Sequence, residues 1–139
     1  MAKIVTFGEL MLRLSPVGYN RLFQTESLEG SFGGGEANVA VSLAQMGDEA
    51  AFVSKFPQNM VGEAALRKLK AYGVNTSHIL RGGKRMGIYY MEKGAAQRPS
   101  VCIYDREGSS FQTSKPEEYC WKEIMQGAQW FHFTGITPA

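Results

Sequence analysis

The chain has 139 residues, of which 44% are hydrophobic and 20% are charged, and its formal net charge is +2. This length and composition suit one ordinary folded domain and exclude a disordered or low-complexity chain. The fifteen basic residues are scattered along the chain, so we expect no nucleic-acid partner. Glycine is in surplus: sixteen residues are about 12% of the chain, against about 7% in an average protein. The surplus predicts loops where the backbone approaches another group closely.

The sequence contains no targeting signal and no cysteine motif typical of a disulfide or a metal site. The first residues lead directly into a strand-like segment, and no stretch comes near the roughly 18 apolar residues that a membrane span requires. Cys102 and Cys120 stand apart, without a CxxC spacing or paired histidines. We therefore expect a cytoplasmic protein with no membrane contact and no metal site in this chain. The two cysteines are expected to be buried as small apolar residues.

Strands and helices alternate in the first half of the chain. Residues 4–8 form a β-branched and aromatic run typical of a buried strand, and residues 50–56 form a second. Three glycines, 33–35, open a predicted helix over residues 36–46, and a second helix is predicted over residues 59–73. This order implies parallel strands with right-handed crossovers, which is an α/β layered fold.

Two segments, 10–32 and 78–113, interrupt this alternation. The first is irregular and rich in turn residues, and the second contains strand-like runs at 87–92 and 100–105. We expect each segment to form antiparallel strands that leave the α/β body and return to it. The two segments can then combine into one small antiparallel β lid.

A third helix and a last strand complete the expected elements. Ser114 and Glu117 have the spacing of a capping box, and an apolar face runs from Trp121 to Ala128. The apolar residues 130–134 predict a strand, which is the last expected element.

The glycine loop does not fit the two common nucleotide-binding motifs. A P-loop would need lysine followed by serine or threonine where Glu36 and Ala37 stand, and a dinucleotide fingerprint would need glycine in place of Asn38. Three polar side chains lie near this loop or after the first strand: Glu36, Asn38 and Glu9. The two carboxylates can accept hydrogen bonds, and the Asn38 amide can both donate and accept them, which suits the hydroxyls of a polyhydroxylated small molecule. The alternative is that the glycines only allow close helix–sheet packing, with Asn38 satisfying a backbone group.

The lid strands carry a second set of candidate binding residues. Tyr89 and its neighbour Tyr90 point to opposite faces of their strand, so one of them faces a ligand. Tyr104 and Arg106 share a face of the next strand, and an arginine fork binds a carboxylate bidentately. The alternative for Arg106 is a surface ion pair with an adjacent glutamate, either Glu92 or Glu107.

These motifs resemble a known family. The run from Gly33 to Ala44, followed by Gly47 and Gly62-Glu63, is similar to the N-terminal signature of the ribokinase-like (phosphofructokinase-B) carbohydrate kinases. The resemblance is strongest to members that phosphorylate 2-keto-3-deoxygluconate. The segments that carry this closer resemblance are Gly8-Glu9, Gly87 to Tyr90, Tyr104 to Ser109 and Thr134 to Ala139.

The resemblance implies a fold and a substrate site. The fold is a Rossmann-like three-layer ribokinase-type α/β domain, incomplete here, with a small β lid. Arg106 would reach the carboxylate of the sugar acid, and homo-oligomers would form through the lid. The substrate-binding residues that the resemblance implies, beside Glu9 from the argument above, are Gly34, Asn38, Tyr89, Tyr104, Arg106 and Ile136.

The family's second signature, close to Asp-Thr-x-Gly-Ala-Gly-Asp, does not occur in the chain. That signature implies the general base and the phosphoryl anion hole, so we expect the base and the ATP-binding half, which uses ATP and Mg²⁺, beyond Ala139. Residues 1–139 are then the N-terminal part of a ribokinase-like domain and inactive alone. The alternatives are a fructokinase or ribokinase of the same family, or a non-catalytic fragment that binds a sugar acid.

Overall fold

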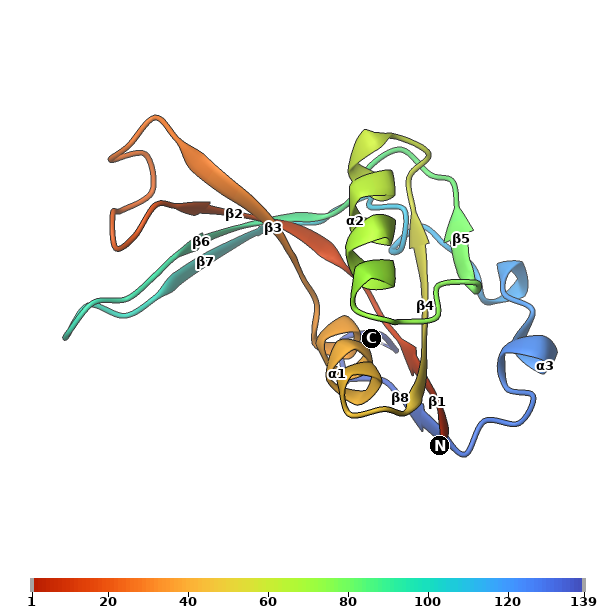
Figure 1. Cartoon of the computed structure of the whole chain (residues 1–139). Helices are drawn as coiled ribbons and strands as arrows, with labels where there is room; N and C mark the ends of the chain where they lie inside the picture. Colours follow the sequence, from red (N-terminus) through yellow and green to blue (C-terminus); the bar gives the residue numbers. More distant parts are fainter. Residues whose placement is uncertain (1, 139) are drawn as a thin grey trace.

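The computed structural model describes residues 2–138, which form an α/β body and a β lid that extends from it (Figure 1). The sheet of the body has the order β5-β4-β1-β8, and its strands are parallel. These strands are β1 (Lys3–Phe7), β4 (Glu49–Phe56), β5 (Ile79–Arg81) and β8 (Trp130–His132). The expected fold class, a layered α/β domain with a small β lid, is confirmed.

Two helices cover one face of this sheet, α1 (Gly35–Gln45) and α2 (Met60–Ala71). Alanines on both helices approach the sheet closely, and Phe52 of β4 is fully buried beneath them. The Asn59 carboxamide oxygen caps α2 by accepting hydrogen bonds from the backbone N–H groups of Val61 and Gly62, at 3.1 and 3.0 Å. No helix within residues 2–138 has the length and apolar character that a membrane crossing needs.

The opposite face of the sheet is covered differently from the sequence prediction. The expected single helix from Ser114 is two short pieces, a 3-10 turn η1 (Pro116–Glu118) and a one-turn helix α3 (Trp121–Ile124). Tyr119 lies between them with extended backbone, and the rings of Tyr119 and Trp121 pack on Phe7, with centroids 5.4 and 5.0 Å away. Aromatic packing against β1 therefore outweighs the helical pattern of this segment.

The lid is a second four-stranded sheet with the order β3-β2-β6-β7. Its strands are β2 (Met11–Pro16), β3 (Leu28–Gly33), β6 (Ile88–Glu92) and β7 (Val101–Asp105). The outer pairs are antiparallel, but β2 and β6 pair in parallel, so the lid is mixed and not purely antiparallel as expected. The reason is visible in Figure 1: β2 and β6 both leave the body and run outward in the same direction.

Segment 78–113, expected to belong to the lid, also supplies a strand to the body. β5 pairs in parallel with β4, and Ile79 lies opposite Ser54. A strand of three residues is too short to show an alternating pattern, so the sequence carries no periodic signal for it.

The expectation of buried cysteines is wrong, because both are exposed. Cys102 lies on β7, which is exposed along its whole length as the edge of a lid with little protein behind it. Cys120 lies in the short link between η1 and α3, where the rings of its neighbours Tyr119 and Trp121 pack on Phe7 and Cys120 itself is exposed.

Candidate functional site

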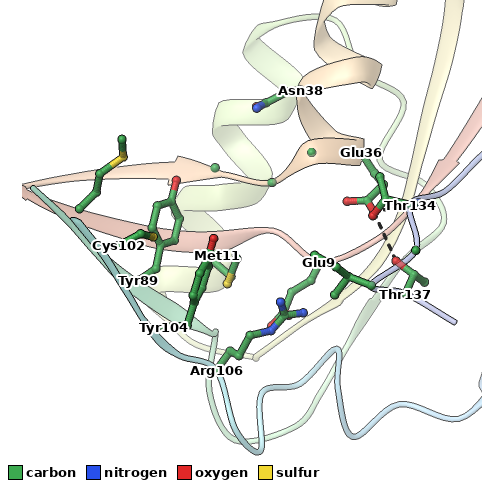
Figure 2. A pocket seen from close by; sticks show the side chains of 16 residues that line it. Glu9, Met11, Glu36, Asn38, Tyr89, Cys102, Tyr104, Arg106, Thr134 and Thr137 are labelled. Carbon is green, nitrogen blue, oxygen red and sulfur yellow. Dashed lines mark hydrogen bonds and ion pairs between the residues drawn. The ribbon is translucent and has the colours of Figure 1, made fainter. Parts of the chain in front are cut away.

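A cavity of about 640 Å³ lies where the lid joins the body (Figure 2). Its walls are the glycine loop before α1, the inner face of the lid and the loop after β8. The structure brings together around this cavity the residues singled out in the sequence: Glu9, Gly34, Asn38, Tyr89, Tyr104, Arg106 and Ile136.

The glycines of this region lie where neighbouring groups approach the backbone closely. A Cβ atom on Gly34 would collide with the carbonyl oxygen of Glu9, and one on Gly33 would collide with the hydroxyl of Tyr89. A Cβ on Gly8, at the end of β1, would collide with the carboxylate of Glu36. In the glycine loop, residues 33–35, the backbone therefore packs closely on neighbouring groups and also faces the cavity.

Glu36 lines the cavity but is engaged by the chain. Its buried Oε1 accepts a hydrogen bond of 2.6 Å from the Thr134 hydroxyl and longer ones, each 3.3 Å, from the Thr134 N–H and the Thr137 hydroxyl. Figure 2 shows this carboxylate directed at the loop after β8. We had expected Glu36 to bind ligand hydroxyls; instead its observed contacts tie that loop to the first turn of α1.

Arg106 forms an ion pair with Glu9, whose carboxylate is almost completely buried. The Arg106 Nη2 atom lies 2.5 Å from Glu9 Oε2, and the Ser109 hydroxyl donates a 2.6 Å hydrogen bond to Glu9 Oε1. The alternative surface pair is not seen, because Glu92 instead lies 3.8 Å from Arg98 and Arg106 turns inward. In Figure 2 the Arg106 side chain rises from the lid toward Glu9.

Aromatic hydroxyls come from the inner face of the lid. The rings of Tyr89 and Tyr104 lie 5.8 Å apart on paired positions of β6 and β7, and both line the cavity. Tyr90 lies on the other face, near Phe23. The hydrogen bond with the Cys102 side chain raises the pKa of Tyr104 above its usual value. A phenol hydroxyl is protonated at neutral pH in any case, so Tyr104 can donate a hydrogen bond.

The cavity also contains residues that the sequence analysis missed. Thr134 and Thr137 line it beside Ile136, and Met11 and Met91 add apolar surface on the lid. Ser109, which holds Glu9, lies just outside it. Ser109 and Thr134 lie in segments that carry the resemblance, but their hydrogen-bond partners are about a hundred positions away in the chain, so their contacts could not be read from local spacing.

The residues described do not fit a Mg²⁺ site. Within residues 2–138 no group of three or more histidine, cysteine, aspartate or glutamate side chains could hold a metal ion. The two carboxylates at the cavity, Glu9 and Glu36, are already held by an arginine and by hydroxyl groups of the chain.

Comparison with known proteins confirms the resemblance found in the sequence. The model of the pfkB family carbohydrate kinases matches residues 1–139. A 2-dehydro-3-deoxygalactonokinase of Haloferax volcanii is 40% identical over 138 residues, which are 99% of this chain and 43% of that protein. A 2-dehydro-3-deoxygluconokinase of Bacillus subtilis is 32% identical, over 97% of this chain and 42% of that protein.

A solved structure agrees closely with the fold. The crystal structure of 2-dehydro-3-deoxygluconokinase from Thermotoga maritima matches with a TM-score of 0.97 and 54% identity, covering 99% of this chain and 42% of that one. The chain thus spans less than half the length of these relatives. With a family match over its whole length, the chain belongs to the pfkB family of carbohydrate kinases.

Proposed function

We propose that the protein carrying this chain is a sugar-acid kinase that transfers the terminal phosphoryl group of ATP to a hydroxyl of 2-keto-3-deoxygluconate, also called 2-dehydro-3-deoxygluconate. The observation that carries the proposal is the position of Arg106, a cation at the wall of a cavity lined by tyrosines and backbone. Relatives named for 2-dehydro-3-deoxy sugar acids support the substrate class.

In the proposed complex the sugar acid lies between the glycine loop and the lid. Its carboxylate meets the guanidinium of Arg106, because a planar fork of N–H donors matches a carboxylate. Tyr89 and Tyr104 direct hydroxyls into the same cavity, and the exposed Asn38 amide can both donate to and accept from a sugar hydroxyl. The backbone at Gly34 and the Ile136 side chain complete the walls.

The remaining machinery is proposed to come from further residues. Phosphoryl transfer depends on positioning and on charge stabilisation of the transferred group. The described residues offer no acidic cluster for Mg²⁺, and the relatives are more than twice as long as this chain. We propose that the general base, the ATP pocket and the Mg²⁺ site lie in such residues, so that residues 1–139 alone bind the acid without phosphorylating it.

The test compares acidic and neutral substrates on the full-length natural protein. Arg106→Ala is expected to raise KM for 2-keto-3-deoxygluconate by roughly ten- to a hundredfold, because charge-assisted hydrogen bonds contribute about 1.5–3 kcal/mol. Activity on fructose and ribose, measured in the same coupled assay, should change less than about threefold. Arg67→Ala, at an exposed position on α2, is the matched control and should leave all three substrates unaffected.

Three outcomes contradict the proposal in different ways. Equal losses on acid and neutral sugars would remove the carboxylate role of Arg106. A higher kcat/KM of the unmodified protein on fructose or ribose would favour the alternative kinases of the family. Binding of the keto acid without phosphorylation would identify a non-catalytic sugar-acid protein. The same assay with the galactonate epimer separates the two substrate names found among the relatives.

We further propose that the protein forms homo-oligomers through the lid. Val101 and Ile103 alternate along β7 with the cavity-lining Cys102 and Tyr104, so they point to the opposite face of the lid. Ile103 is 51% exposed and Phe23, packed near Tyr90 on that face, is 77% exposed. Apolar side chains gathered on a thin sheet favour burial against a second copy.

A further inference from the structure

We propose that Glu9 and Ser109 are positioning residues that hold the guanidinium of Arg106 in the direction required by a substrate carboxylate. This inference rests on the proposed function and adds to it the origin of selectivity for an acid over a neutral sugar. It also gives Glu9 a role different from binding sugar hydroxyls.

The three side chains form a chain of contacts from the buried interior to the cavity. Ser109 is 1% exposed, and its hydroxyl donates to Glu9 Oε1 at 2.6 Å. Glu9 Oε2 then lies 2.5 Å from Arg106 Nη2. The backbone N–H of Ser109 also donates to the carbonyl of Arg106 at 3.1 Å, so Ser109 contacts both Glu9 and Arg106.

The surrounding backbone leaves room for this arrangement. A Cβ on Gly87, where the chain enters β6, would lie 2.7 Å from Glu9 Oε1 and 3.2 Å from Arg106 Cβ. Glu9 belongs to the link between β1 and β2, while Arg106 directly follows β7. The ion pair therefore joins two of the connections between lid and body.

The ion pair leaves most of the guanidinium available. A guanidinium has five N–H donors, and Glu9 lies against one terminal nitrogen, while the side chain of Arg106 is 27% exposed and lines the cavity. A buried carboxylate such as Glu9 needs a charged or hydrogen-bonded partner, so its contact with Arg106 persists between turnovers. The flexible arginine is thus ordered before the substrate arrives, which lowers the entropic cost of binding.

The charge of Glu9 argues against direct contact with an acidic substrate group. The Glu9 carboxylate would repel the substrate carboxylate in direct contact. By orienting Arg106, however, Glu9 favours binding of the substrate carboxylate to the guanidinium. The ion pair thus predicts that loss of either holding contact weakens recognition of the acid without affecting hydroxyl recognition.

The experiment uses two neighbouring serines in the full-length natural protein. Ser109→Ala removes the hydroxyl that holds Glu9, at a position that does not line the cavity. Ser110→Ala is the matched control, because Ser110 is equally buried and its hydroxyl donates instead to the carbonyl of Arg85 at 2.9 Å. The substrates are 2-keto-3-deoxygluconate and 3-deoxyfructose, which has a hydroxymethyl group in place of the carboxylate.

Ser109→Ala is expected to raise KM for the acid about fivefold, the effect of losing the hydrogen bond to Glu9, with kcat unchanged. KM for 3-deoxyfructose should stay within about twofold in both serine variants, and Ser109→Thr should restore the acid KM because it keeps the hydroxyl. In an Arg106→Ala background, Ser109→Ala should cause no further loss, since the hydroxyl acts through that arginine.

The outcomes separate the two proposals. A natural protein that shows no preference for the acid overturns the proposed function, and this inference with it. A natural protein that prefers the acid, while Ser109→Ala and Ser110→Ala behave alike, overturns the inference alone. Parallel losses on both substrates in Ser109→Ala, or an undiminished effect in the Arg106→Ala background, indicate a structural role and also overturn it.

Discussion

At the first turn of α1, the buried carboxylate of Glu36 holds the loop that forms one wall of the cavity. It accepts three hydrogen bonds through one oxygen, from Thr134 and Thr137, and it lies where the positive end of the helix dipole favours a negative charge. No charged partner is needed when hydroxyl and backbone donors surround a carboxylate in this way. Glu36 therefore stabilises the wall of the cavity.

Glu36→Ala is expected to lower the free energy of unfolding by about 1–3 kcal/mol, because the partly buried donors of Thr134 and Thr137 lose their acceptor. Glu63→Ala is the control: Glu63 occupies the first turn of α2, but its side chain is 51% exposed and pairs with Arg81. It should cost less than about 1 kcal/mol. Urea unfolding of both variants decides the point, and equal losses would contradict a specific role for Glu36.

At the scale of elements, an aromatic cluster decides the shape of the segment after the lid. Phe7 of β1 lies within 5.0–5.4 Å, between ring centroids, of Phe111, Tyr119 and Trp121. The Tyr119 hydroxyl donates to the Ser114 hydroxyl at 2.8 Å, which brings the start of the segment back onto η1. The two short helical pieces are thus held by side-chain packing and not by helix propensity.

Tyr119 makes this packing sensitive to alkaline pH. Burial raises the pKa of Tyr119, and the Ser114 hydrogen bond offsets this in part. The folded-state pKa lies above that of an unfolded tyrosine, so the stabilisation is complete below about pH 10 and is lost as pH rises through the folded-state value. Thermal unfolding midpoints between about pH 8 and pH 11 should therefore fall more steeply for the natural protein than for Tyr119→Phe.

The control for this prediction is Tyr19→Phe, at a position that is 68% exposed. It should follow the natural protein at every pH. If the slopes of the natural protein and Tyr119→Phe coincide instead, ionisation of Tyr119 is not linked to folding.

At the scale of the molecule, the body and the lid bury their apolar residues to different degrees. The body encloses its core between helices and aromatic rings, whereas the lid has a cavity on one face and exposed apolar side chains on the other. The strands of the lid are mostly half-buried or exposed, so the lid has little core of its own and gains stability from an additional contact surface.

Ile103→Asp is expected to dissociate the proposed homo-oligomer, because a desolvated charge at the interface is strongly unfavourable. Sedimentation of the full-length natural protein should give a mass of at least two chains, and the variant should give one. Met60→Asp, at an 86% exposed position of α2 in the body, is the control and should not change the mass. An oligomer that survives Ile103→Asp, or a monomeric natural protein, would contradict the role of the lid.

Sequence patterns predicted the elements whose signals are local. The buried run of β1, the two glycine-terminated helices and the cap at Asn59 each depend on neighbours within a few residues. The parallel pairing of β2 with β6, the three-residue β5 and the break before α3 depend on distant contacts, and they were missed.

The same division holds at the cavity. Spacing on the lid strand indicated Arg106 as a cation for a carboxylate, and the family resemblance implied that the lid tyrosines share a site with the glycine loop. The partners that hold Glu9 and Glu36 are separated from them by 100 and 98 positions, and only the folded chain brings them together. Local patterns therefore could not show whether Glu9 and Glu36 contact a ligand or hold neighbouring side chains.

The parallel pairing inside the lid also has a consequence for biosynthesis. The β2–β3 hairpin is complete at Gly33, but its partner strand begins only at Ile88. At the usual elongation rate of about 5–20 residues per second, the ribosome needs roughly three to eleven seconds to supply the missing strand. Throughout that interval one edge of β2 has no partner, and it is during translation that this hairpin is most exposed to mispairing with another nascent chain.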